Sequence, residues 1–351
     1  MLKLFASARK LLRRRPAPPA AGALSTNPDE RAGSSIRLSW VWTTATHPDA
    51  NLGDALSAVI VSAMSGLKVE RASFGQPVER LAAVGTIGHA QHGGKIHLWG
   101  TGFDLKRNWK GALSAYEIPA NTELVVHGVR GRRTATALRK LGLQVPDVFG
   151  DPVWFLPRVF PFEHREKDCE LGVIVHISEL DTATAVASVR ANLARYDIPP
   201  SLTSSIRIIN TYTPPTLEGL RDKVREIASC RRILSTSLHG LVIAETYGIP
   251  CAWFANQKGS SGFISIEGDR PIDHRMIDFY SGVDRDCVLS YVQPMQSTTD
   301  WDQAMRFLDA HWSPLAYTGE RLFDAFPLDR VVKFERQRWK ARPGLLEANP
   351  Y

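Results

Sequence analysis

Apolar residues from Ile36 onward fall into short runs that alternate with amphipathic segments, a pattern typical of strands alternating with helices. In the first half, strands are expected at 36–42, 81–84, 96–99 and 124–127, and helices at 54–65 and 132–141. In the second half, strands are expected at 171–177, 206–210, 232–235 and 251–255, and helices at 183–194, 217–229 and 238–247. A further helix is expected to begin at Trp301, because Trp301, Met305, Leu308 and Trp312 recur at helical spacing.

Strands that alternate with helices of this length imply parallel sheets built from right-handed βαβ units. Two such series predict an α/β fold with two Rossmann-like domains, at 36–160 and 171–298, followed by a C-terminal helical segment at 299–351. The Pro-containing stretch at 152–168 is interpreted as the connection between these domains. The length of 351 residues agrees with two units, because a single hydrophobic core usually stops growing below this size.

The N-terminal segment 1–35 is predicted to be a basic arm followed by a flexible linker. Its first 15 residues place leucines on one helical face among several arginines, and Lys3 and Arg9 interrupt the apolar stretch that a secretory signal needs. A disordered tail is favoured, because the Pro-, Ala- and Ser-rich residues that follow cannot pack. The alternative is a short amphipathic helix resting on an anionic membrane surface.

Most of the positive charge lies in this arm. The formal net charge is +7, but residues 1–31 hold seven Lys/Arg and two Asp/Glu, which leaves only +2 for the remaining residues. A nucleic-acid partner is therefore not expected. The four cysteines are far apart and form no Cys-x-x-Cys pair, which argues against disulfides and zinc and favours reduced thiols in a cytoplasmic protein. No apolar run approaches the ~18 residues that span a bilayer.

Ligands of parallel α/β sheets bind beyond the carboxyl ends of the strands, so the loops there are the candidate sites. The first is Asn51-Leu-Gly53-Asp54, where a helix N-terminus offers free N–H groups to an anion; a plain helix cap is the alternative. The second is Gly100-Thr-Gly102, which suits a phosphate or sugar but equally suits a tight turn.

Two further loops carry charged side chains. Arg130 begins a helix after a strand and is placed to hold a carboxylate or phosphate, and Asp151 follows in Gly150-Asp-Pro. The last loop, Ser235-Thr-Ser-Leu-His239-Gly, combines hydroxyls and an imidazole at a strand-to-helix turn. Histidine is the side chain best suited to move protons near neutral pH, although an isolated histidine is often simply buried. No histidine spacing suggests a metal site.

In this order the motifs resemble the polysaccharide pyruvyl transferase family. The matching segments are Asn51-Leu-Gly-Asp54, Gly100-Thr-Gly102, Val129-Arg130-Gly131, Gly150-Asp151-Pro152, and Ser235-Thr-Ser-Leu-His239-Gly240 leading to Tyr247-Gly-Ile-Pro250. The resemblance covers residues 36–280 and implies two Rossmann-like domains facing across a cleft, as in GT-B glycosyltransferases. It also implies transfer of a pyruvyl group from phosphoenolpyruvate to two hydroxyls of one sugar residue in a cell-surface polysaccharide, an exopolysaccharide or a lipid-linked precursor, with no cofactor.

The resemblance also implies roles for individual residues. His239 is expected to be the general acid, Arg130 the anchor of the anionic donor, and Asp54 the group that orients or deprotonates the acceptor hydroxyl. Backbone amides at Gly240 are expected to hold the phosphate. The other expected substrate-binding residues are Asn51, Gly53, Gly100, Gly102, Asp151, Ser235, Ser237 and Glu245.

One position departs from the family pattern. Some members place an arginine two residues before the histidine, where this chain has Ser237. The missing charge is expected to come from Arg130, Arg231, Arg232 or Lys258.

Two other functions stay open at this point. A glycosyltransferase of the same architecture would use a nucleotide sugar, with His239 and Glu245 serving the sugar donor. A carbohydrate-binding protein without activity would not depend on His239 at all.

Overall fold

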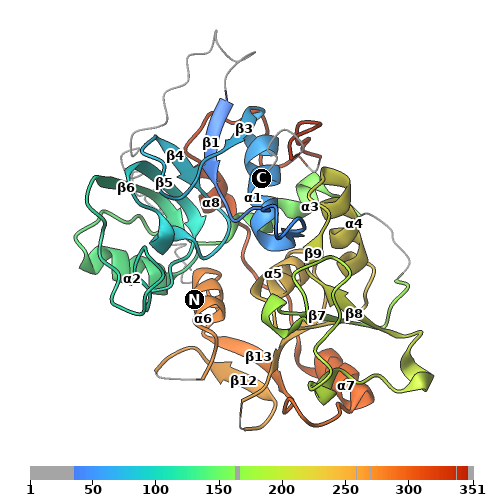
Figure 1. Cartoon of the computed structure of the whole chain (residues 1–351). Coiled ribbons are helices and arrows are strands. Elements are labelled where there is room, and N and C mark those ends of the chain that lie inside the picture. Colours follow the sequence, from blue (N-terminus) through green and yellow to red (C-terminus); the bar gives the residue numbers. More distant parts are fainter. Residues whose placement is uncertain (1–34, 163–166, 258, 269–270, 337, 347–351) are drawn as a thin grey trace, which may run out of the picture.

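Two mainly parallel sheets, one from each half of the sequence, organise the chain (Figure 1). The computed structural model describes residues 35–162, 167–257, 259–268, 271–336 and 338–346. The predicted basic arm and nearly all of the predicted linker lie outside the described residues. The α/β class is confirmed, and the parallel sheets with their helices are compatible with a Rossmann-like fold.

The first sheet has five parallel strands in the order β3-β1-β4-β5-β6. Their bounds are Ser35–Ser39 for β1, Lys68–Arg71 for β3, Arg80–Ala82 for β4, Gly94–Thr101 for β5 and Thr122–Val129 for β6. Helix α1 (Leu52–Ser65) follows β1, and helix α2 (Arg132–Lys140) follows β6. Strand β3 was not predicted, and β1 ends at Ser39 rather than at Trp42.

The second sheet has six strands in the order β12-β13-β11-β10-β7-β8, of which β12 runs antiparallel to β13. Its strands are β7 Leu171–Val175, β8 Ile206–Asn210, β10 Ile233–Ser235, β11 Cys251–Ala255, β12 Gly262–Ser265 and β13 Cys287–Val292. The helices are α4 Leu217–Ala228, α5 Leu238–Thr246, α6 His274–Gly282 and α7 Trp301–His311. Strands β12 and β13 and helix α6 were not predicted. A short antiparallel pair, β2 (Ala50–Asn51) with β9 (Tyr212–Thr213), joins the two halves.

The predicted helix at 183–194 is wrong. These residues form turns and bends, a bridge pairs Leu180 with Val189, and only a 3-10 turn, Ala194–Tyr196, follows. Side chains from elsewhere take the backbone groups that a helix would use. Asp49 accepts from the amide of Ala185, and Asn210 donates to carbonyls of the same segment. Such bonds compete directly with the helical pattern.

Residues 152–162 of the Pro-containing stretch, which was expected to connect the two domains, pack into the core. They form a 3-10 turn, Pro152–Phe155, and the short helix α3, Leu156–Val159. Val153, Phe155 and Leu156 are fully buried against α1 and α5, so apolar packing continues from one half of the chain into the other. After α7 the chain returns to the first sheet through α8 (Glu320–Asp324), where Trp99 Nε1 donates to the carbonyl of Leu322.

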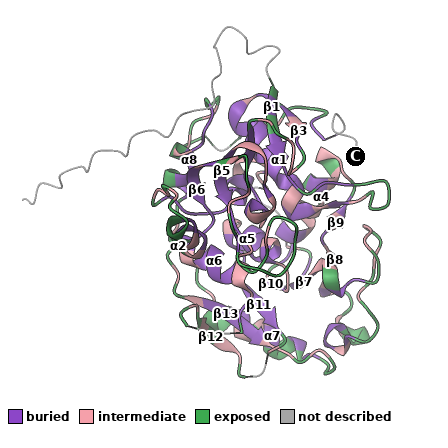
Figure 2. Ribbon diagram, turned by 60° about the vertical axis from the view of Figure 1, so that its left-hand side comes forward, coloured by how far each residue is buried: buried purple, intermediate pink, exposed green. Residues whose placement is uncertain are grey.

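Helices α1 and α5 lie at the centre of the molecule and are buried on nearly every side (Figure 2). Asp54 is the one residue of α1 that is not buried. In α5 the exceptions are His239, in the first turn, and Thr246, at the end. A helix that is apolar all round belongs inside a protein, so a partly exposed polar residue at its N-terminus marks a candidate site.

Candidate active site

A pocket of about 200 Å³ opens where residues of the two halves meet. Both predicted catalytic residues, Asp54 and His239, line it. Its other lining residues are Val41, Asn51, Thr86, Ile87, His176, Ile177, Thr211, Ser237, Leu238 and Arg275. Asn51 and Ser237, two of the predicted substrate-binding residues, are therefore brought to the same pocket.

The N-terminus of α1 meets the imidazole of His239 without room for a side chain. Asn51 caps this helix, since its Oδ1 accepts from the amide of Gly53 at 3.2 Å. A Cβ built on Gly53 would lie only 1.8 Å from Nδ1 of His239. Glycine is required at this position because the ring packs directly on the backbone. Asn51 therefore has the alternative capping role, and it also lines the pocket.

His239 faces a buried carboxylate. Its Nε2 lies 3.8 Å from Oδ2 of Asp151, and neither atom has a hydrogen-bond partner among the described residues. Burial, followed by the charges of Arg130 and Arg275, lowers the pKa of His239 to about 3. Burial also raises the pKa of Asp151 to about 6, although its Oδ1 accepts from the amide of Val153. Without a ligand, His239 is therefore a neutral imidazole at physiological pH.

Arg130 lies fully buried behind the pocket wall. Its Nε donates to Asp278 Oδ2 at 3.2 Å, and its Nη1 donates to Thr86 Oγ1 at 2.7 Å. Its Nη2 has no partner among the residues described. Arg130, Asp151 and His239 thus each carry a buried polar atom without a hydrogen bond. Such atoms are costly to bury without a partner. Of the three residues, His239 lines the pocket, whereas Arg130 and Asp151 do not.

The two predicted glycines after β5 do not line the pocket. Gly100 adopts a φ of +80°, and a Cβ there would lie 2.4 Å from the ring of Pro152. A Cβ on Gly102 would lie 2.3 Å from Nη2 of Arg130. Both residues therefore allow close packing beneath the site, and Gly102 makes room for the guanidinium.

Ser235 and Gly240 shape the turn that begins α5. The Ser235 hydroxyl donates to the carbonyl of Ser237 at 2.8 Å and accepts from its amide at 3.0 Å. Ser235 is fully buried, and a Cβ on Gly240 would lie 2.3 Å from its Oγ. The turn is held internally, which leaves Ser237 facing the pocket.

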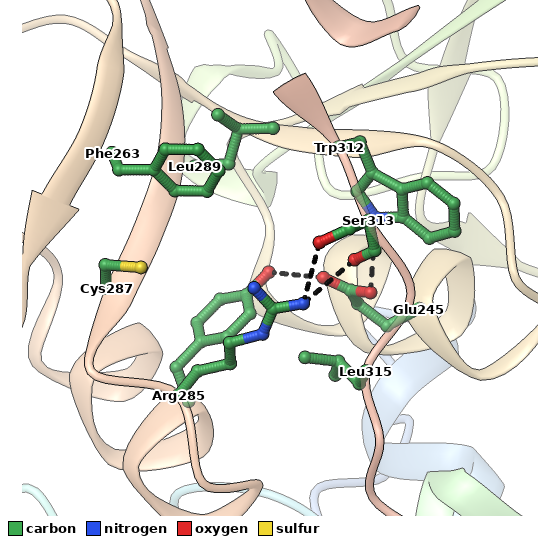
Figure 3. Close-up of a pocket in the computed structure, with 9 residues that line it drawn as sticks. Glu245, Phe263, Arg285, Cys287, Leu289, Trp312, Ser313 and Leu315 are labelled. Atoms are coloured by element: carbon green, nitrogen blue, oxygen red, sulfur yellow. Dashed lines mark hydrogen bonds between the residues drawn. The ribbon is translucent and has the colours of Figure 1, made fainter. Parts of the chain in front are cut away.

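Glu245 does not join His239. It lies in a separate cavity of about 20 Å³, shown in Figure 3, where Tyr280 donates to one carboxylate oxygen and Trp312 to the other. Burial raises the pKa of Glu245 to about 7. His239 and Glu245 are six positions apart in α5, which separates them by about 9 Å along the helix axis. They therefore lie in different cavities.

Arg275 is a charged pocket residue that the sequence did not indicate, as are the uncharged Val41, Thr86, Ile87, Ile177 and Thr211 and the histidine His176. Arg275 stands in the first turn of α6, a helix that the apolar pattern failed to predict. By contrast, two of the residues expected to replace the arginine missing at Ser237 form ion pairs elsewhere. Arg231 pairs with Glu170, and Arg232 pairs with Asp309 and Glu170. Lys258 lies outside the described residues.

Asp54 is held in an environment that favours its protonated form. Burial raises its pKa to about 7, against the opposing charge of Arg275 and with a smaller contribution from Asp151. A carboxyl group with this pKa can both accept and release a proton near neutral pH. Because the folded protein binds this proton more tightly than the unfolded chain, stability is lost as pH rises from about 4 toward 7.

We therefore expect Asp54→Asn to be more stable than the wild type at pH 8, by about 1–3 kcal/mol. Thermal melting of both proteins from pH 4 to pH 8 measures this difference. At pH 4 the wild-type carboxyl is protonated in the folded state, so the two melting temperatures should converge there. A difference that does not change with pH would contradict the raised pKa.

Within the described part of the chain, no cluster of three or more His, Cys, Asp or Glu side chains is arranged to hold a metal ion. Nor does any described helix combine the length and the apolarity needed to cross a membrane.

The fold is that of an α/β protein with parallel sheets, and the pocket lies beyond the carboxyl ends of strands. The polysaccharide pyruvyl transferase family model matches residues 86–258, which confirms the resemblance seen in the sequence and supports a transferase enzyme. This range includes Arg130, Asp151 and His239, whereas Asp54 and Arg275 lie outside it. No curated protein and no solved structure matches the chain.

Proposed function

We propose that this protein transfers the pyruvyl group of phosphoenolpyruvate to a sugar residue of a cell-surface polysaccharide, an exopolysaccharide or a lipid-linked precursor, and forms a pyruvate ketal. The observation that carries the proposal is the set of buried, unpartnered polar atoms on Arg130, Asp151 and His239 beside the pocket. Phosphoenolpyruvate bears a carboxylate and a phosphate, so it needs cationic donors close to a proton donor.

In the proposed reaction, the His239 imidazolium protonates the methylene carbon of the donor. The adjacent carbon becomes electrophilic, and a sugar hydroxyl attacks it while Asp54 takes the hydroxyl proton. The C–O bond to phosphate then breaks and phosphate leaves. A second hydroxyl closes the ketal and returns its proton to the neutral His239, while the proton on Asp54 passes to phosphate or solvent. No cofactor takes part.

Charge explains how a histidine with a pKa of about 3 can act as an acid. Besides burial, the positive charges of Arg130 and Arg275 disfavour the imidazolium in the ligand-free site. A donor with several negative charges favours the imidazolium and so offsets the effects of burial and of the two arginines. Its binding should therefore raise the pKa of His239. The proton would then reach His239 only when the substrate that needs it is bound.

A donor screen tests the function. Purified protein is incubated with lipid-linked oligosaccharides and either phosphoenolpyruvate or a sugar nucleotide. We expect inorganic phosphate and a ketal on the sugar from phosphoenolpyruvate, and no reaction with sugar nucleotides. Release of a nucleoside diphosphate would instead establish the glycosyltransferase. Binding of the saccharide without turnover of any donor would establish a carbohydrate-binding protein.

We extend the proposal to the arrangement and place of the enzyme. The two halves would form GT-B-like domains with the acceptor bound in the cleft between them. The enzyme would work in the cytoplasm, and the basic arm at 1–35 would contact the inner membrane face, where a lipid-linked acceptor is available.

A further inference from the structure

We propose that Arg275 binds the acidic groups of the donor and supplies the positive charge that this chain lacks at Ser237. The inference rests on the proposed function and assigns a donor-binding residue that lies outside the matched range of the family model. Arg275 and Ser237 line the same pocket as His239. Both positions therefore face the same pocket.

The guanidinium of Arg275 is already oriented. Its Nε donates to Asp273, and its Nη2 donates to Asp273 Oδ2 at 2.6 Å. Asp273 also caps α6, because its Oδ1 accepts from the amide of Arg275 at 2.9 Å. Nη1 lies 3.2 Å from Nε2 of His176. A side chain fixed in this way loses little conformational entropy when a ligand binds.

Enough hydrogen-bonding capacity remains for a ligand. Arginine has five N–H donors; Asp273 accepts from two of them, on Nε and Nη2, and a third faces Nε2 of His176. One N–H on Nη1 and one on Nη2 have no partner among the described residues. The pair of terminal nitrogens matches the spacing of two oxygens on a carboxylate or phosphate. The side chain is 28% exposed, so these groups are accessible from the pocket.

Helix α6 places both cations of the site. Arg275 and Asp278 are three residues apart, on one side of this helix. Asp278 is the carboxylate that holds Arg130, and it also accepts from the amide and the hydroxyl of Thr134. The backbone of α6 approaches so closely that a Cβ on Gly131 would lie 1.6 Å from the carbonyl oxygen of Asp278. The two guanidinium groups are therefore held in fixed positions relative to each other.

The two positive charges match the two anionic groups of the donor. Phosphoenolpyruvate carries its carboxylate and its phosphate on the same carbon, so two separate cations near one imidazole suit it better than a single charge does. Both Arg130 and Arg275 lower the pKa of His239, which shows that both charges lie near the ring. Arg130 is fully buried, whereas Arg275 is open to the pocket and is the contact that an incoming donor reaches directly.

The test moves the charge from one position to the other. We expect Arg275→Gln to raise both the KM and the Kd for phosphoenolpyruvate by about 10- to 100-fold, the effect of losing one or two charge-assisted hydrogen bonds. The KM for the acceptor should change little. The double variant Arg275→Gln with Ser237→Arg should recover most of the loss, because it restores a guanidinium to the same pocket.

Arg306→Gln is the matched control, since Arg306 is an exposed arginine on α7. It should bind phosphoenolpyruvate as the wild type does. Thermal melting of each variant checks folding. An unchanged KM and Kd in a folded Arg275→Gln would overturn the inference, as would a double variant that binds no better than the single one. If the wild type neither binds nor consumes phosphoenolpyruvate, the proposed function itself fails, independently of the variants.

Discussion

We expect His239→Ala to lower kcat with phosphoenolpyruvate by about 10²- to 10⁴-fold, the usual contribution of a positioned proton donor. His239 lines the pocket, and its Nε2 has no hydrogen-bond partner among the described residues, so the substitution removes no hydrogen bond of that atom. The melting temperature should therefore stay close to that of the wild type. Steady-state kinetics together with thermal melting measure both parts of the prediction.

We also expect His239 to take up a proton when phosphoenolpyruvate binds. The imidazole is neutral before the donor binds, and the proposed reaction needs an imidazolium, so binding should draw a proton from solution. Calorimetric titration with phosphoenolpyruvate in buffers of different ionisation enthalpy counts this proton. His239→Ala should lose the uptake, whereas His311→Ala should keep it, because His311 is exposed on α7. Turnover by His239→Ala at the wild-type rate would exclude it as the general acid.

We expect Arg130→Met to destabilise the protein by about 3–5 kcal/mol, the usual cost of removing one partner of a buried ion pair. Arg130 is fully buried, and Asp278 is 1% exposed. Their pair joins the turn before α2 to α6. Without the guanidinium, the carboxylate of Asp278 keeps its bonds from Thr134 but loses the charge that compensates it.

Arg132→Met provides a matched control for this stability effect. Arg132 pairs with Asp284 between the same two segments, but both side chains are more than half exposed. An exposed pair contributes about 0–1 kcal/mol, so this variant should unfold close to the wild type in a urea titration. Equal losses of stability in the two variants would show that burial of the Arg130 pair carries no special weight.

Much of the site was predictable because it follows from local sequence. The helix cap Asn51 and the histidine, both expected just after strands, line the pocket, since the carboxyl ends of parallel strands gather on one edge; the glycines after β5 do not line it. Asp54 and His239 both line the pocket. The separation of Glu245 from His239 was also predictable, because residues six positions apart in a helix lie about 9 Å apart along its axis.

The sequence alone established most of the alternation of strands and helices, the positions of two turns that line the pocket, and the helix that presents His239. These features depend on neighbours in the chain. Tertiary structure alone decided that Asp151 lies opposite His239, that Arg130 is held by Asp278, and that Arg275 enters the pocket. It also replaced the helix expected at 183–194 with turns bonded to Asp49 and Asn210. Contacts between residues distant in sequence arise from how elements pack, and no local pattern of apolar and polar positions records them.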